Sequence, residues 1–129
     1  MKLLPNLQPS IALIACALLT AGALPASANA AGENIGDVTK CIQISRVKSS
    51  PIIDDRTILV EMFGKDKYKR IDLASSCSGL EFSGFEVRLR QNRLCSTDTI
   101  VVRQNVGAVC RIDKIVIIDK AEAKALRAN

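Results

Sequence analysis

The sequence predicts a small all-β domain, which is an antiparallel sheet, a sandwich or a partly open barrel of about six strands stapled by two disulfides. Two observations carry this prediction. Short runs of β-forming apolar residues recur along residues 40–119, and turn-forming residues separate them. Four cysteines are spread through the same part of the chain, and an even number of cysteines in a short exported chain indicates disulfides.

Residues 1–30 have the features of a secretory signal peptide that precedes this domain. Lys2 is followed by a stretch without charge, and the apolar run 11–24 ends at Pro25. Two Ala-x-Ala sites suited to cleavage lie within residues 26–30. A helix needs roughly 18–20 apolar residues to span a bilayer, so this run favours cleavage over an uncleaved anchor helix. We therefore expect the rest of the chain to be exported and not to be transmembrane after processing.

Lipidation at Cys16 is an alternative to soluble export. The residues Leu13-Ile14-Ala15-Cys16 resemble the lipobox of bacterial lipoproteins, in which the cysteine is lipidated and becomes the new N-terminus. The chain continues apolar after Cys16, however, where a lipoprotein has a polar tether. Soluble export is the preferred prediction, and an anchor on the envelope through Cys16 is the alternative.

The first part of the exported chain predicts a loose segment and then a strand. Residues 31–39 are polar and contain glycine, so we expect a flexible lead-in. Residues 41–47 alternate, with Ile42 and Ile44 on one face, and are expected to form the first strand. Pro51 lacks the N–H that a ladder needs and ends this strand.

The strongest strand signal follows at residues 57–63. Ile58, Val60 and Met62 would lie on one face, with Leu59 and Phe63 on the other. Apolar residues on both faces indicate a central strand that is covered on both sides.

The remaining elements follow from alternation and turn residues. Residues 64–67 predict a hairpin loop into a strand at 68–73. Residues 85–90 alternate cleanly, with Phe85, Val87 and Leu89 inward. Further strands are expected through residues 100–102 and at 110–119, joined by a hairpin at 105–108. Residues 120–129 contain helix formers but are too few for an independent helix, so we expect a frayed tail.

The cysteines that follow the signal peptide are Cys41, Cys77, Cys95 and Cys110. Zinc sites usually draw on closely spaced ligands, whereas these cysteines are far apart and the chain has no His. Disulfides are therefore preferred, and no metal site is predicted. Four cysteines allow three pairings. We favour the nested arrangement, Cys77–Cys95 inside Cys41–Cys110.

The chain resembles an uncharacterised family, a domain of unknown function, of small exported proteobacterial proteins. The resemblance covers about residues 40–113 and rests on the blocks Cys41-Ile42, Asp54-Asp55-Arg56-Thr57-Ile58, Cys77-Ser78-Gly79-Leu80, Leu94-Cys95-Ser96-Thr97-Asp98-Thr99-Ile100 and Cys110. The chain departs from the family pattern at Tyr68-Lys69-Arg70-Ile71 and after Cys110. The resemblance implies a Gram-negative periplasmic or envelope setting, or secretion, and no activity.

The composition argues against an enzyme. Without His, Ser-His and Cys-His nucleophiles are excluded within one chain, and no nucleotide-binding motif indicates a cofactor. Asp54, Asp55 and Asp98 are the carboxylates that remain for a hydrolase, for metal-dependent chemistry or for a weak calcium site. The simpler interpretation is that they accept backbone N–H groups in turns or pair with Arg56 or another arginine.

The net charge of +5 is mild, and the basic and acidic residues are interspersed along the chain. Aromatic residues are scarce. A nucleic-acid partner is therefore not expected. The basic residues of segment 65–70 would suit an anionic envelope component, or would simply guard a sheet edge.

These observations predict an exported, non-catalytic binding domain for a protein or an envelope component. Its candidate binding residues are Asp54, Asp55, Arg56 and Asp98. A hydrolase built on the three aspartates and a small secreted inhibitor are the alternatives.

Overall fold

The computed structural model describes residues 34–65, 67–104 and 106–129. The predicted signal peptide, its cleavage sites and Cys16 lie outside the described residues. Among the helices of the described part, none is long and apolar enough to cross a membrane.

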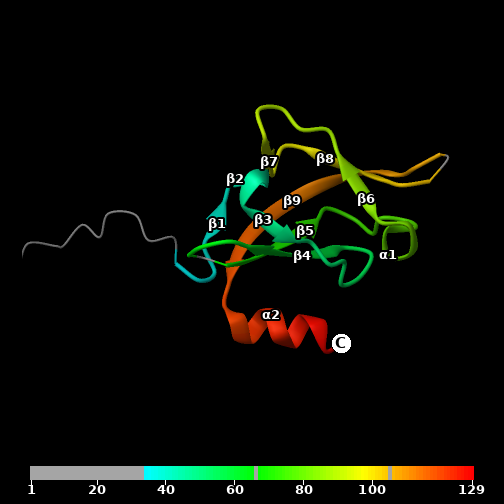
Figure 1. Ribbon diagram of the computed structural model, residues 1–129. Coiled ribbons are helices and arrows are strands. Elements are labelled where there is room, and N and C mark those ends of the chain that lie inside the picture. The colour runs from blue at the N-terminus through cyan, green and yellow to red at the C-terminus, as the bar shows by residue number, and fades with distance from the viewer. Residues whose placement is uncertain (1–33, 66, 105) are drawn as a thin grey trace, which may run out of the picture. The chain divides into compact units, whose positions relative to one another are not determined.

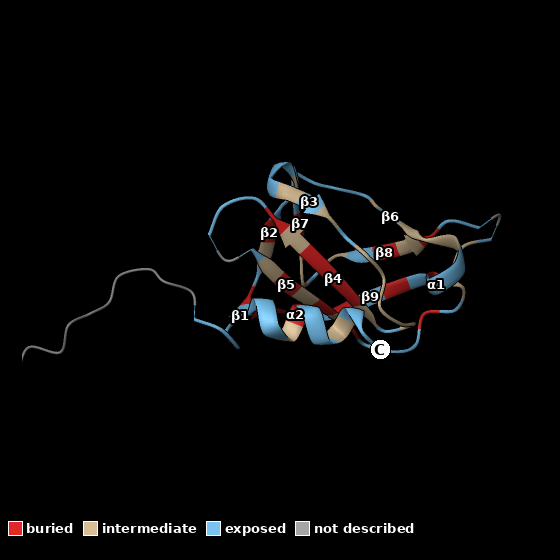
Figure 2. Cartoon of the chain, turned by 60° about the horizontal axis from the view of Figure 1, so that its bottom comes forward, coloured by how far each residue is buried: buried red, intermediate tan, exposed pale blue. Residues whose placement is uncertain are grey.

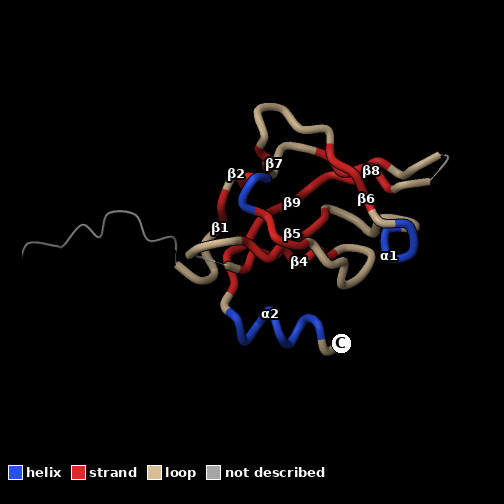
Figure 3. Tube along the Cα trace, viewed as in Figure 1, coloured by secondary structure: helices blue, strands red, loops and turns tan. Residues whose placement is uncertain are grey.

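A curled antiparallel sheet forms the body of the domain (Figures 1 and 3). Its strands follow one another in the order β3 (Val47–Ser49), β4 (Thr57–Met62), β5 (Tyr68–Leu73), β9 (Val109–Ile118), β8 (Thr99–Val102) and β6 (Phe85–Val87). The sheet curls into a half-barrel, which confirms the predicted all-β class and its partly open form. The short strand β1 (Val38–Thr39) pairs with β9, and β2 (Cys41–Gln43) pairs with β7 (Arg93–Cys95) in a separate ribbon.

The long strand β9 joins the two parts of the sheet. Its first residues, 109–111, pair with β8, and residues 112–118 pair with β5. β1 pairs with Ile115 and Val116 of the same strand. Residues 115–118 in its second half are buried on both faces, because Ile115 belongs to one buried apolar cluster whereas Val116 and Ile118 belong to another, which also contains Leu59.

The concave face of the half-barrel holds the main core. Ile58, Val60 and Met62 of β4 point into it together, as the alternation predicts, and Leu59 is buried on the opposite face. β4 and β9 accordingly contain long buried stretches in Figure 2. Phe63, expected beside Leu59, is instead 58% exposed because β4 ends at Met62.

The C-terminal residues form a helix, so the prediction of a frayed tail is wrong. Helix α2 (Lys120–Arg127) begins at Asp119, whose side chain accepts the N–H of Glu122 at 2.7 Å. Ala123 and Leu126 pack against the convex face of the sheet, in a cluster with Leu59. Tertiary packing therefore stabilises a helix that would be too short on its own.

The N-terminal strand is also different from its prediction. Residues 41–47 form β2, a 3₁₀ turn (Ile44–Arg46) and the start of β3. The chain has to turn there because β2 pairs with β7 whereas β3 pairs with β4. The lead-in 31–39 likewise contains β1, which is fixed by pairing with β9.

The strand expected at residues 85–90 ends early. β6 stops at Val87, and Leu89, expected inside, is 37% exposed. Gln91 and Asn92 adopt positive φ angles of 58° and 54°, which turns the chain into β7. The hairpin loop at residues 64–67 is found between β4 and β5, as predicted.

The disulfides are Cys41–Cys95 and Cys77–Cys110, so the nested pairing Cys41–Cys110 and Cys77–Cys95 is wrong. That pairing assumed that the first and last strands are neighbours. In the structure Cys41 lies opposite Cys95 in the β2–β7 ribbon. Cys77 follows β5, which is the neighbour of β9 and thus of Cys110.

Glu61 of β4 connects the edge strand β3 to the end of α2. Its carboxylate accepts hydrogen bonds from Lys48 Nζ at 3.0 Å, Ser49 Oγ at 3.3 Å and Arg127 Nη2 at 3.1 Å. The hydrogen bond from Lys48, followed by that from Arg127, holds the pKa of Glu61 below its ordinary value of 4.5.

Acid is therefore expected to weaken this connection. A carboxylate with a lowered folded pKa contributes stability that is fully present above the unfolded pKa and is lost as the pH falls through the folded pKa. We expect Glu61→Gln to lower the urea midpoint at neutral pH and to lower it much less at an acidic pH well below 4.5, where the carboxyl group is protonated in the folded protein as well. Urea unfolding at both pH values measures this difference. Glu86→Gln, which removes an exposed carboxylate, is the control, and an equal loss for Glu61→Gln at both pH values would contradict the account.

Candidate functional site

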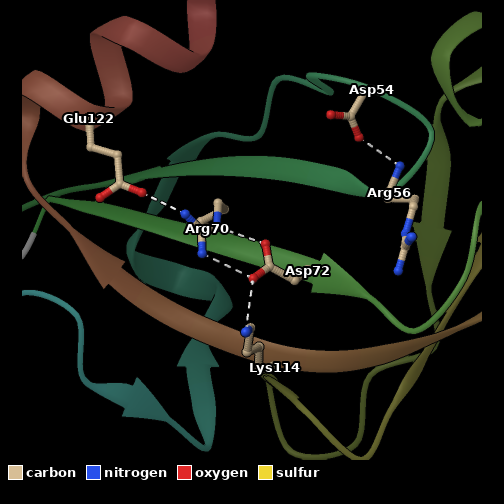
Figure 4. A network of polar contacts seen from close by, with 6 residues as sticks. All are labelled: Asp54, Arg56, Arg70, Asp72, Lys114 and Glu122. Atoms are coloured by element: carbon tan, nitrogen blue, oxygen red, sulfur yellow. Dashed lines mark hydrogen bonds and ion pairs between the residues drawn. The ribbon is translucent and has the colours of Figure 1, made fainter.

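The aspartates singled out from the sequence lie in turns. The Oδ1 atom of Asp54 accepts the backbone N–H of Arg56 at 2.8 Å, just before β4 (Figure 4). The Oδ2 atom of Asp98 accepts the backbone N–H of Cys95 at 2.7 Å. The backbone oxygen of Asp55 accepts the N–H of Cys77 at 2.8 Å. The simpler interpretation, in which Asp54 and Asp98 serve as turn formers, is therefore confirmed.

A surface hollow of about 490 Å³ brings three of the four predicted binding residues together. Asp54, Asp55 and Arg56 line it with Asp72, Asp113 and Lys114. Asp98 is not among its lining residues. The hydrolase hypothesis required all three predicted aspartates in one concave site, and this hollow does not unite them.

The side chains of Arg70 and Lys114 pair with Asp72, whose carboxylate lines the hollow. The Nε and Nη2 atoms of Arg70 donate to the two oxygens of Asp72 at 2.7 and 3.1 Å, and Nη1 donates to Glu122 of α2 (Figure 4). Lys114 Nζ lies 3.9 Å from Asp72. The hydrogen bond to Asp72 raises the pKa of Arg70. This network joins β5 to α2 and so has a structural role.

The described residues contain no group of three or more side chains suited to holding a metal ion. In the acidic hollow, Asp54 and Asp72 are each engaged in contacts within the chain. Two of the carboxylates that line the hollow are thus already paired within the chain.

A different site lies within the half-barrel. A half-open pocket of about 510 Å³ borders the concave face. Most of its lining residues are apolar. They come from β2, the 3₁₀ turn, β3, β4, β5, β6, β7 and the connection between β3 and β4, and they are Ile42, Ile44, Val47, Ile52, Val60, Ile71, Phe85, Val87 and Leu94. Ser50, Gly84, Glu86 and Arg103 complete the lining.

The pocket exists because the sheet is not closed. β3 and β6 are the two ends of the strand order, and residues of both line the same pocket. Val47, Phe85 and Val87 of these edge strands are only partly buried, whereas Val60 and Ile71 at the floor are fully covered. The sheet therefore presents a preformed apolar surface between its own edges.

Polar groups stand at the β6 side of this pocket. The backbone N–H of Arg103 donates to the carbonyl of Gly84 at 3.0 Å. The side chains of Glu86 and Arg103 are exposed, and neither forms an ion pair within the described residues. An amphiphilic ligand would find the exposed Arg103 here and apolar groups deeper in the pocket, whereas the side chain of Glu86 alternates with the inward Phe85 and Val87 and points away from the pocket.

The edge strands themselves are poorly suited to adding another strand. β3 has three residues, a register irregularity between Val47 and Ser49, and Pro51 shortly after its end. β6 also has only three residues. Short strands, bulges and prolines are the devices by which proteins prevent edge-to-edge pairing. The pocket therefore suits a ligand that needs no backbone ladder.

Sequence reasoning missed the pocket. Its apolar lining residues read as ordinary core positions, and only the strand order places them around an opening. A weak signal was available, since the short edge strands carry large apolar residues next to charged ones, as in Phe85-Glu86-Val87.

Comparison with known proteins identifies a family for this chain. A family model described as a family of unknown function (DUF6491) matches residues 3–129. The chain belongs to this family. The assignment confirms the resemblance to an uncharacterised family, and the match includes the whole half-barrel of this DUF6491 chain. The searches of curated proteins and of solved structures gave no match. A functional proposal for this DUF6491 domain therefore depends on the chemistry of its site.

Proposed function

We propose that this DUF6491 chain is an exported, non-catalytic binding domain whose half-barrel pocket takes the acyl chain of a small amphiphilic envelope component. The observation that carries the proposal is the apolar pocket between the unpaired edges β3 and β6. The two disulfides support export, because such bonds persist in the periplasm and outside the cell. A periplasmic or secreted domain and one anchored through Cys16 are both compatible with this function.

The size and lining of the pocket favour an acyl chain. Its volume of about 510 Å³ lies in the range of roughly 300–1,000 Å³ typical of small-molecule sites. Each methylene moved from water into such a lining contributes about 0.8 kcal/mol. A chain of about ten carbons would therefore gain roughly 8 kcal/mol before the costs of ordering it are subtracted. The exposed Arg103 at the pocket leaves a polar headgroup in contact with water and charge.

Filling the pocket is expected to abolish most of this binding. Val87 lies on the edge strand β6 and lines the pocket, so Val87→Trp places an indole in the space of the ligand. We expect the affinity for a dansyl-labelled undecanoic acid to fall by about tenfold or more, equivalent to about 1.4 kcal/mol. Dansyl fluorescence, with displacement by unlabelled dodecanoate, measures the affinity.

Val38→Trp is the matched control because Val38 is 61% exposed on β1 and does not line the pocket. It should bind the probe as the parent protein does. Equal affinity of the parent protein and Val87→Trp, or no saturable binding by the parent, would refute the proposed function.

A further inference from the structure

Two large apolar side chains project almost completely into solvent from separate segments. Phe82 of α1 (Leu80–Ser83) is 90% exposed, and Val106 in the connection between β8 and β9 is 93% exposed. Val109, at the start of β9, is 66% exposed. Single exposed apolar residues are ordinary, whereas larger exposed apolar patches mark interaction sites. We call these three residues the apolar tip.

The segments that carry the apolar tip are joined to each other. Gln104 Nε2 donates to Ser83 Oγ at 2.9 Å, next to Phe82. The disulfide Cys77–Cys110 connects the loop before α1 to the residue after Val109. In Figure 1, α1 and the β8–β9 connection lie at the same end of the domain, away from β1. The tip is therefore held together by covalent and hydrogen bonds.

The apolar tip also borders the pocket. Gly84 and Arg103 both line the pocket, and the bond of 3.0 Å from Arg103 N to Gly84 O joins them. Gly84 lies two residues after Phe82, and Arg103 lies three residues before Val106. An object that covers Phe82 and Val106 would thus stand beside the β6 side of the pocket.

We propose that the apolar tip inserts into a lipid bilayer and brings the pocket against the membrane, so that an amphiphile passes directly from the bilayer into the half-barrel. This inference rests on the proposed function. An acyl chain that fits the pocket partitions into bilayers for the same reason that it binds the protein. The bilayer is therefore the source from which such a ligand has to be collected, and the tip lies beside the pocket that receives it.

Charge has a minor part in this contact. Arg103 and Arg111 are exposed near the tip, and Glu81 and Glu86 oppose them on α1 and β6. Binding should consequently occur on neutral phosphatidylcholine vesicles and should change little with salt, because it depends on apolar insertion rather than on anionic headgroups.

Vesicle binding and ligand transfer test the inference separately from the proposed function. The exported protein is sedimented with phosphatidylcholine vesicles, with and without phosphatidylglycerol. We expect the double variant Phe82→Ser/Val106→Ser to reduce the bound fraction by about fivefold or more. Its affinity for dansyl-undecanoic acid in solution should remain that of the parent, while transfer of the probe from loaded vesicles slows by about tenfold.

The control is Ile35→Ser/Val38→Ser, which removes apolar side chains that are 63% and 61% exposed, near β1. It should bind vesicles and accept the probe as the parent does. The urea midpoint of each variant reports whether it is folded. Val87→Trp should show the opposite phenotype, with vesicle binding kept and probe binding in solution lost.

Two results would overturn the inference. One is a parent protein that does not sediment with vesicles, or that does so equally well without Phe82 and Val106. The other is a parent that is dimeric in analytical ultracentrifugation and becomes monomeric in the tip variant, because the tip would then be a contact between copies of the chain. Failure of the parent to bind the probe in solution would instead refute the pocket as a ligand site.

Discussion

Replacing Cys77 and Cys110 together with alanine should lower the free energy of unfolding by about 2–5 kcal/mol. The bond spans 33 residues, and the loop-closure model assigns roughly 4 kcal/mol to a loop of that length. Both cysteines also belong to the main core, at 0% and 6% exposure. A domain of this size has a total stability of about 5–15 kcal/mol, so the variant should be marginally folded. Urea unfolding measures the change.

The companion variant Cys41→Ala/Cys95→Ala removes the bond of the β2–β7 ribbon, which spans 54 residues. Its cysteines are only partly buried. The variant should therefore lose the restraint on the unfolded chain but should disturb the packing of the core less than the first variant does. Peptide mapping by mass spectrometry without reduction should recover Cys41 joined to Cys95. Recovery of Cys41 joined to Cys110, or full stability after removal of either bond, would contradict this architecture.

Truncating Ile71 to alanine is expected to cost about 2–5 kcal/mol. Ile71 has no exposed surface and lies in β5, between Ile58 of β4 and Ile115 of β9. Alanine would leave a cavity at the centre of the concave core, where three strands hold their neighbours in place and cannot collapse freely. The shift in urea midpoint at a constant m-value measures the loss.

Phe63→Ala is the control for this prediction. Phe63 follows β4 but is 58% exposed, and surface substitutions usually change stability by no more than about 0.5 kcal/mol. Similar losses for both variants would mean that β5 does not lie at the centre of the core.

The local pattern of apolar residues was sufficient to predict the central strands. The residues Ile58, Leu59 and Val60 are apolar on both faces and indicated a covered strand before any partner was known. The same reasoning succeeded for β5 and β9, since each combines apolar alternation with turn residues at its ends. In these segments burial and β-propensity agree, so tertiary structure does not overrule them.

Long-range pairing was beyond this reasoning. The positions of the cysteines in sequence do not reveal that β2 pairs with β7, which is why the nested disulfides were wrong. Helix α2 was missed for a related reason, because its stability comes from packing Ala123 against the sheet near Leu59 rather than from its length.

In the candidate sites, too, local features could be predicted from the sequence and long-range features could not. The turn bonds of Asp54 and Asp98 are local and were predictable from residue type. The pocket depends on the strand order, which leaves β3 and β6 unpaired on either side of an apolar floor. No short segment of sequence encodes that arrangement.

The proposed function places the acyl chain of the ligand in this pocket. Methyl-resolved NMR titration of the exported protein with dodecanoate, below its micelle concentration, tests it most directly. We expect saturable shifts of the methyl groups of Ile42, Val47, Val60 and Val87, which line the pocket, with little change at Val116 beneath α2. The absence of saturable shifts, or shifts confined to the α2 face, would contradict the account.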